Sequence, residues 1–211
     1  MAKLLILLLL LTTAPLIGNT ASATSQDYLY FSSDTILSAI ETVDKTVVIS
    51  PNVTLTIQSG SDYVINGNLI IYGEVKNTGK LTVNGEIYAN NYNNFMFGDS
   101  SNPAGKLSNS GSLRVQSLKV TTDYPDPLFD YTGPEDQSSV GSSSNEVTGV
   151  SFPGLPYDVS GPLNGGGALV KEDGTFRERI VLQEGLNEIT GTVTDPFGNT
   201  VTKNMTINHE K

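Results

Sequence analysis

The 211-residue chain contains no cysteine, no tryptophan and a single histidine. Without cysteine it has no disulfides, no thiolate metal ligands and no N-terminal cysteine for lipid attachment. His209 lies near the C-terminal end, where we expect a frayed tail rather than a rigid catalytic site. The sequence therefore lacks the residue types that zinc binding and thiol or serine–histidine catalysis need.

Basic residues and long apolar runs are also scarce. There are 12 Lys and Arg against 22 Asp and Glu, a formal charge of −10. Nucleic acids and anionic membranes are bound through clustered Lys and Arg, so this charge argues against both as partners. The longest apolar run, Leu4–Leu11, is much shorter than the roughly 20 residues of a transmembrane helix.

The N-terminus has the layout of a secretory signal peptide. Lys3 precedes the apolar run, and Ala21-Ser22-Ala23 follows it as an A-x-A-like cleavage site. The alternative is an anchoring helix that is never cut. Cleavage after Ala23 removes residues 1–23, and with them Lys3 but no acidic residue, so the formal charge becomes −11. We expect a secreted, extracellular or cell-surface associated protein that does not span the membrane after signal cleavage.

Glycine recurs every six residues in "GNLIIYGEVKNTGKLTVNGEIY" (67–88), and an apolar residue lies two positions beyond each glycine, at Leu69, Val75, Leu81 and Ile87. This period predicts short strands separated by corners, and we expect the glycines to take corners with positive φ. Single units of this kind bury nothing, so they must stack. The pattern predicts a short, single-stranded parallel β-solenoid over residues 46–120, with a right-handed stack favoured.

The glycine pattern has two other interpretations, a phosphate-binding loop and a set of antiparallel hairpins. A phosphate-binding loop needs G-x-x-x-x-G-K-[ST] before a helix, and "GEVKNTGKL" has the wrong spacing and is followed by strand residues. A set of antiparallel hairpins remains an alternative, because Asn-Gly turns favour hairpins. In the solenoid, Asn77 and Asn109 take inward positions, where stacked amides can bond one another. Ahead of it, residues 24–45 are expected to form an N-terminal cap with a capping helix at 33–43.

Two segments carry candidate binding residues. An interruption at residues 90–104 contains Tyr92, Phe95 and Phe97, which either bind a ligand or pack on the solenoid flank. Residues 121–146 have the composition of a linker, rich in Pro, Asp, Ser and Gly. Acidic and aromatic side chains in it form either a sugar or calcium site or a solvated spacer, and we single out Asp126, Asp130 and Tyr131.

Residues 147–211 predict an all-β sandwich. Runs with strand-like alternation begin at Val147, Tyr157, Gly167, Thr175, Asn187 and Thr200, with turn signals between them. The alternation places three groups of residues in the core: Phe176, Ile180 and Leu182; Ile189 and Val193; Val201, Met205 and Ile207.

The motifs of "DGTFRERIVLQEGLNEITGTVTDPFGNTVTKNMTI" (173–207) carry a family resemblance. A D-G-x-F strand, an L-x-x-G-x-N turn and a D-x-x-G-N turn begin at Asp173, Leu182 and Asp195. This stretch resembles the bacterial Ig-like modules called glucodextranase domain B. The resemblance implies an accessory role, such as spacing, docking or sugar contact beside another function. The six-residue region resembles Gly/Asn-rich adhesin-type β-solenoids in composition.

Catalytic and metal sites have few candidates. Glu74, Lys80 and Glu86 occupy equivalent places in three successive glycine units and could share one outer face of a stack, as a lyase would need. The weak calcium candidates are Asp173, Asp195 and Asn199, although two or three oxygen ligands are too few and turn formation explains them as well. We expect no cofactor, with calcium possible.

Two function classes follow from these features. The first is a non-catalytic cell-envelope or extracellular protein that presents the solenoid and the Ig-like module for adhesion, scaffolding or glycan binding. Its partner would be a polysaccharide, a cell-envelope component or another surface protein. The alternative is a small polysaccharide-active enzyme, a lyase or hydrolase, that uses acidic residues of the 123–136 segment.

Overall fold

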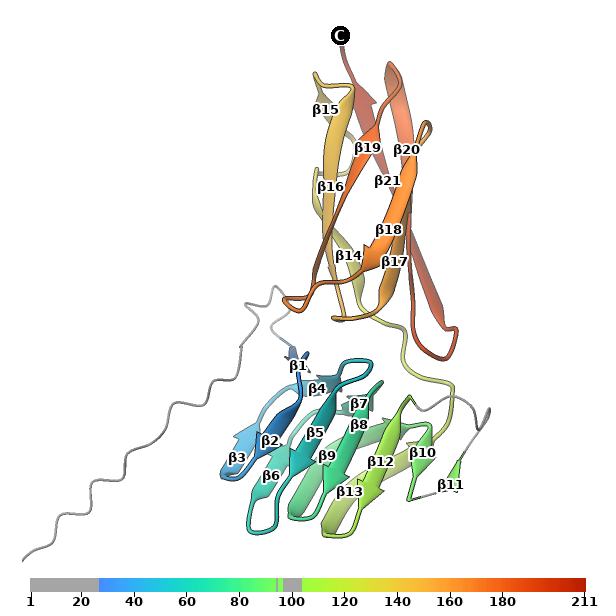
Figure 1. The fold of residues 1–211 in the computed structure, drawn as a ribbon. Helices are drawn as coiled ribbons and strands as arrows, with labels where there is room; N and C mark the ends of the chain where they lie inside the picture. The colour runs from blue at the N-terminus through green and yellow to red at the C-terminus, as the bar shows by residue number, and fades with distance from the viewer. Residues whose placement is uncertain (1–26, 94, 97–103) are drawn as a thin grey trace, which may run out of the picture.

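The computed structural model describes residues 27–93, 95–96 and 104–211, and every regular element in these ranges is a β-strand. Figure 1 shows two stacked parts, a parallel solenoid and an elongated sandwich that stands end-on above strands β1 and β4. No helix in these ranges is long and apolar enough to cross a membrane. The chain is therefore all-β, with a short parallel solenoid followed by an Ig-like sandwich.

The solenoid has three faces, and each coil contributes one strand to every face. Face 1 contains β1 (Tyr28–Phe31), β4 (Thr46–Ile49), β7 (Leu69–Ile71) and the second halves of β9 (Lys80–Ala89) and β13 (Ser112–Val120). Face 2 contains β2 (Thr35–Leu37), β5 (Thr54–Ile57), β8 (Glu74–Asn77) and β12 (Lys106–Asn109). Face 3 contains β3 (Ile40–Val43), β6 (Asp62–Ile65) and the first halves of β9 and β13.

The strand pairs between successive coils are parallel, with one register shift between Val115 and Ser117, and this parallel pairing excludes the hairpin alternative. Three strands separated by corners make one turn, and before the interruption a residue stacks on one 18 to 22 positions later. Asp62 pairs with Lys80, Thr35 with Leu55 and Ile40 with Asp62. The predicted inward positions are confirmed, because Leu69, Val75, Leu81 and Ile87 are fully buried. They form one interior with the other inward side chains of the stack.

The corner glycines are required for a different reason than the sequence suggested. Gly67, Gly73, Gly79 and Gly85 do not have positive φ, so that prediction is wrong. Each lies instead where the neighbouring coil passes very close: a Cβ on Gly79 would lie 2.1 Å from the carbonyl oxygen of Gln58. Glycine is needed at these corners because neighbouring coils, about 4.8 Å apart like paired strands in general, leave no room for a side chain there.

The capping helix expected at 33–43 is wrong, because these residues form β2 and β3 of the first coil. The six-residue beat already begins here: Leu37 and Val43 are buried, in register with Ile57 and Ile65. A helix over 33–43 would place Ile36 with Leu37 and Ile40 on one apolar stripe, but Ile36 is 60% exposed on the outer side of the coil. Residues 24–26 of the expected cap lie outside the described ranges, as does the expected signal peptide (1–23).

Part of the interruption at 90–104 extends face 2 at the C-terminal end of the stack. β10 (Asn91–Tyr92) pairs with β12, and β11 (Phe95–Met96) pairs with β10. Amides hold this end together. Asn77 donates a 2.7 Å hydrogen bond to Asn109, as the sequence predicted, and Asn93 donates to the Asn109 carbonyl.

The sandwich consists of a three-stranded and a five-stranded sheet. Sheet C contains β14 (Phe129–Gly133), β16 (Ser144–Ser151) and β19 (Thr175–Val181). Sheet D contains β15 (Ser138–Val140), β21 (Thr200–His209), β20 (Gly185–Thr194), β17 (Pro156–Ser160) and β18 (Gly165–Leu169). The pairs are antiparallel except that β15 runs parallel to β21. The sandwich therefore begins at Phe129, and the linker predicted over 121–146 is wrong beyond residue 128.

The sandwich core contains the side chains that strand alternation predicted. Phe176, Ile180, Ile189, Val193 and Ile207 are each at most 2% exposed. Phe129, from the supposed linker, stacks on Phe176 with ring centroids 5.2 Å apart. The apolar alternation identified this core, whereas the polar composition of residues 121–146 concealed the two strands that close one side of it.

The corner packing predicts a large difference between two glycine substitutions. Gly79→Ala forces a Cβ against the Gln58 backbone, and we expect it to cost about 1–3 kcal/mol, as overpacking does. A Cβ on Gly141 meets nothing within 4 Å, so Gly141→Ala should change stability by less than about 0.5 kcal/mol. Denaturant melts of the two variants measure the difference, and equal stabilities would contradict the close approach of the coils.

Candidate functional site

Face 1 of the solenoid differs from the other two faces in its outward side chains. One column on this face is apolar over four coils, through Tyr30, Val48, Ile70 and Tyr88, which lie in register. All four are buried, although they point away from the solenoid interior. They share a cluster with the sandwich core, so the sandwich covers this face.

Aromatic rings make the junction between the two parts. Phe152, in the turn after β16, lies 5.1 Å from Tyr28 and 6.2 Å from Tyr72, measured between ring centroids. Phe197, in the turn between β20 and β21, lies 6.3 Å from Tyr72. Two loops of the sandwich therefore contact tyrosines of the solenoid, and Figure 1 shows the end of the sandwich that faces the solenoid.

The segment between β13 and β14 is fixed by the same junction. Tyr124 is 4% exposed, and its ring lies between Tyr72 and Phe197, with centroid distances of 5.4 and 4.3 Å. Its hydroxyl donates a 2.8 Å hydrogen bond to the Ile71 carbonyl, and burial raises its pKa. The segment of residues 121–128, called the wedge below, is thus packed between the two parts and does not act as a flexible linker.

The aromatic residues of the interruption are only partly described. Tyr92 is half-buried and packs against the solenoid interior, which favours the flank-packing alternative over a free binding loop. Phe95 lies in β11, and Phe97 lies outside the described ranges.

The acidic candidates of the 123–136 segment do not form a pair. Asp126 lies in the wedge segment and is exposed, whereas Asp130 lies in β14 and forms a 3.1 Å ion pair with Lys203. Tyr131 packs inside the sandwich against Phe129, and burial raises its pKa to about 12. Asp130 and Tyr131 both contact Lys203 of β21, the first through its ammonium group and the second through its backbone carbonyl. These contacts attach β14 to sheet D and explain both residues without a ligand.

The weak calcium candidates belong to turns. Asp195 accepts hydrogen bonds from the amides of Phe197 and Asn199 and from the Asn199 side chain, at 2.7–2.9 Å. Asp173 accepts bonds from the amide and hydroxyl of Thr175, which lower its pKa. In the described ranges no three acidic or histidine side chains gather as metal ligands. Turn formation explains these residues.

Glu74, Lys80 and Glu86 do not share an outer face, so that expectation is wrong. Because each six-residue unit advances the chain by one face, they lie on faces 2, 3 and 1 in turn. They take part in separate ion pairs, with Lys106 at 3.2 Å, Asp62 at 2.5 Å and Lys119 at 2.8 Å respectively.

One of these pairs belongs to a compact charged set. Glu86 accepts hydrogen bonds from Lys119 and Tyr88, and these bonds lower its pKa. Glu86 and Tyr88 together raise the pKa of Lys119. Both charged groups are held in their ionised forms, whereas a general acid or base works best with a pKa near the operating pH. The set is therefore poorly suited to proton transfer.

His209 is not in a frayed tail. It ends β21, pairs in register with Gly185 and is 8% exposed.

Truncation of a junction side chain should uncouple the unfolding of the solenoid from that of the sandwich. Phe152→Ala removes a ring that is 1% exposed, and buried Phe→Ala changes cost about 3–5 kcal/mol. Because that ring is shared, we expect the variant to lose coupled unfolding and to show two calorimetric transitions. Leu186→Ala, at a side chain 77% exposed, is the control and should melt like the parent. If Phe152→Ala retains the parent's single sharp transition, the junction does not couple the two parts.

Calcium should leave stability unchanged, because the oxygens of Asp195 already accept backbone and amide hydrogens. If calcium bound the folded protein, calcium at 100 times its Kd would raise the free energy of unfolding by about 2.7 kcal/mol and the Tm by roughly 5–10 °C. Thermal melts with calcium chloride and with a chelator test this, and a calcium-dependent rise of that size would contradict it.

The comparisons with known proteins concern mainly the sandwich. A search of curated proteins found no match. Among solved structures, a crystal structure of an engineered protein aligns with a TM-score of 0.33 and 13% identity, over 48% of this chain and 22% of that one. Residues 131–210 match the family model described as glucodextranase, domain B. Residues 131–210 thus form an Ig-like β-sandwich that is similar to glucodextranase domain B, and this sandwich follows a parallel β-solenoid.

Proposed function

We propose that this protein is a secreted, non-catalytic component of the cell envelope or extracellular matrix that binds a polysaccharide. The solenoid acts as a platform, and the sandwich is the module that contacts the polymer. The observation that carries the proposal is the junction: an apolar column on one solenoid face holds the base of the sandwich, so the sandwich projects at a fixed angle.

The fixed projection suits presentation better than catalysis. An enzyme site commonly lies in a cleft between parts or on a concave surface, where side chains converge. Here the space between the two parts is filled by the rings of Tyr72, Tyr124, Phe152 and Phe197. What remains accessible is the outer surface of the sandwich and two flat solenoid faces.

The carbohydrate class is supported by the family match. Glucodextranase domain B is a module named for a carbohydrate-active enzyme, and the match covers residues 131–210. Acid pairs of the kind used in glycoside hydrolysis lie within 5–10 Å of each other. Asp130 forms an ion pair with Lys203, and the side chain of Asp126 is exposed. These placements support a binding role for the sandwich.

A retention and turnover experiment tests the proposal. Mature protein is passed over immobilised neutral and acidic polysaccharides, and the same polymers are assayed for new reducing or unsaturated ends, with and without calcium. We expect retention on at least one polymer and no turnover on any. Failure to bind any polymer would remove the binding role, and turnover abolished by Asp126→Ala or Asp130→Ala would establish the enzyme instead.

A further inference from the structure

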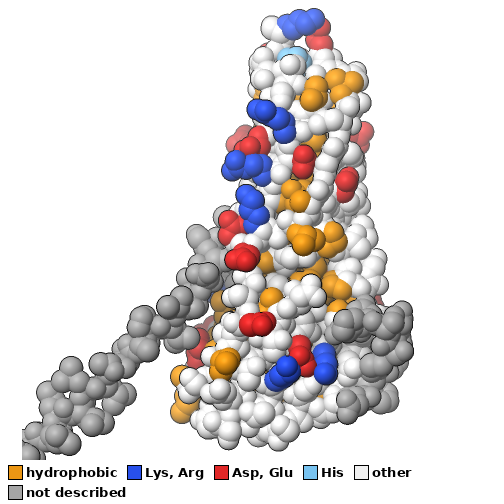
Figure 2. All heavy atoms as spheres, in the orientation of Figure 1, with side chains coloured by type: hydrophobic (Ala, Val, Ile, Leu, Met, Phe, Trp, Pro, Cys, Tyr) orange, Lys and Arg blue, Asp and Glu red, His pale blue; other side chains and the backbone are white. Residues whose placement is uncertain are grey.

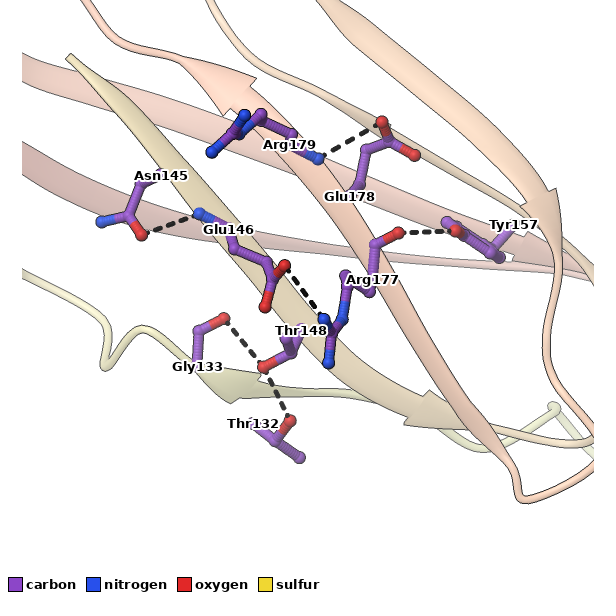
Figure 3. A network of polar contacts seen from close by, with 9 residues as sticks. All are labelled: Thr132, Gly133, Asn145, Glu146, Thr148, Tyr157, Arg177, Glu178 and Arg179. Atoms are coloured by element: carbon purple, nitrogen blue, oxygen red, sulfur yellow. Dashed lines mark hydrogen bonds and ion pairs between the residues drawn. The ribbon is translucent and has the colours of Figure 1, made fainter. Parts of the chain in front are cut away.

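The two outer faces of the sandwich differ in chemistry. Figure 3 shows sheet C, where Arg177 and Glu146 form a 3.3 Å ion pair across β19 and β16 and Arg179 lies beside them. Figure 2 shows Lys, Arg, Asp and Glu side chains intermingled along one flank of the sandwich. Such a face presents mixed charge that is partly neutralised within itself.

The outer face of sheet D is instead built from threonine. In "NEITGTVTD" and "TVTKNMTIN" the alternate positions that hold Ile189, Val193, Met205 and Ile207 face the core, and the positions between them are largely threonine. Strands β20 and β21 pair so that these residues lie side by side, with Thr194 opposite Thr200 and Thr192 opposite Thr202. Six threonines are half-buried or exposed on this face: Thr190, Thr192, Thr194, Thr200, Thr202 and Thr206.

The array is regular and stiff. Alternate residues on a strand are roughly 6.6 Å apart and neighbouring strands roughly 4.8 Å apart, so the hydroxyls form a grid. Threonine is branched at Cβ and has few rotamers, so ordering its side chain on binding costs little entropy. The hydroxyls of Thr194 and Thr200 already bond one another at 3.0 Å. The adjoining strands continue the flat surface, since Gly165 and Gly167 have no side chains to project from it.

The charge of this face selects the chemistry of its ligand. The residues that share the outward side with the threonines include Asp158 and Glu188, both exposed. Lys203 lies on β21 but turns away to pair with Asp130. No Lys or Arg therefore balances the two acids on the described outward positions, and an acidic polymer would be repelled. Hydroxyls that donate and accept, together with threonine methyl groups, match a neutral polymer with hydroxyls and C–H faces.

We propose that the threonine face of sheet D is the polysaccharide-binding surface and that it takes a neutral polysaccharide lying flat across β20 and β21. This inference rests on the proposed binding function and assigns it a site and a ligand class.

The test compares matched variants on the two faces. Thr190→Val/Thr192→Val/Thr202→Val removes three hydroxyls but keeps side-chain shape and strand preference. Arg177→Ala/Arg179→Ala alters the charged face of sheet C and is the control. Affinity of the mature protein is measured for dextran, soluble starch and cellulose as neutral probes and for alginate as an acidic probe, after melts show that both variants are folded.

We expect the parent to bind at least one neutral glucan and not alginate. The triple threonine variant should lose about tenfold or more in affinity, because three hydrogen bonds are removed, and the arginine variant should bind as the parent does. Binding to neutral glucan that survives the threonine changes, or that is lost with the arginine changes, would overturn the site while leaving the binding function in place. Preference for alginate would overturn the ligand class, and absence of binding to all four polymers would overturn both the site and the proposed function.

Discussion

The outward apolar column on face 1 of the solenoid is the contact on which the arrangement of the molecule depends. A three-sided stack has three outer faces, and charged or polar side chains dominate the outward positions of β5, β8 and β12 on face 2. On face 1 the column from Tyr30 to Tyr88 is apolar and would be a costly exposed patch if it were bare. Phe152 of the sandwich packs on Tyr30, and Tyr124 packs on Tyr88 and on Phe197. Burial of this shared apolar surface fixes the orientation of the sandwich relative to the solenoid.

The regular part of the solenoid could be predicted because glycine recurs every six residues in the sequence. Apolar residues two apart after each glycine identified both the strands and the interior. The number of units per turn was not predictable in this way, because a six-residue period fixes the strand and the corner but not the angle at each corner. For that reason Glu74, Lys80 and Glu86 were expected on one face and lie on three. The first coil was mistaken for a helix because Ile36, Leu37 and Ile40 also satisfy helical spacing in so short a segment.

The candidate site was less predictable, since it depends on the polar half of the alternation. The apolar positions of β20 and β21 were recognised as core, whereas the threonines between them were overlooked, although their two-residue spacing was a usable signal. The loop-like composition of residues 121–146 conceals strands β14 and β15, and β15 pairs with β21, far along the chain. Asp130 and Tyr131 consequently looked like ligand-binding residues, while the fold uses one in an ion pair and the other in packing.

A distance measurement between the two parts tests the account most directly. The chain has no cysteine, so Ile36→Cys on the solenoid and Leu186→Cys at the far end of the sandwich can carry spin labels without background. Both side chains are exposed, and neither belongs to the aromatic cluster of the junction. A fixed junction predicts one narrow distance distribution from pulsed dipolar spectroscopy, which broadens when Phe152→Ala is added. A broad distribution in the parent protein would contradict the fixed projection of the sandwich.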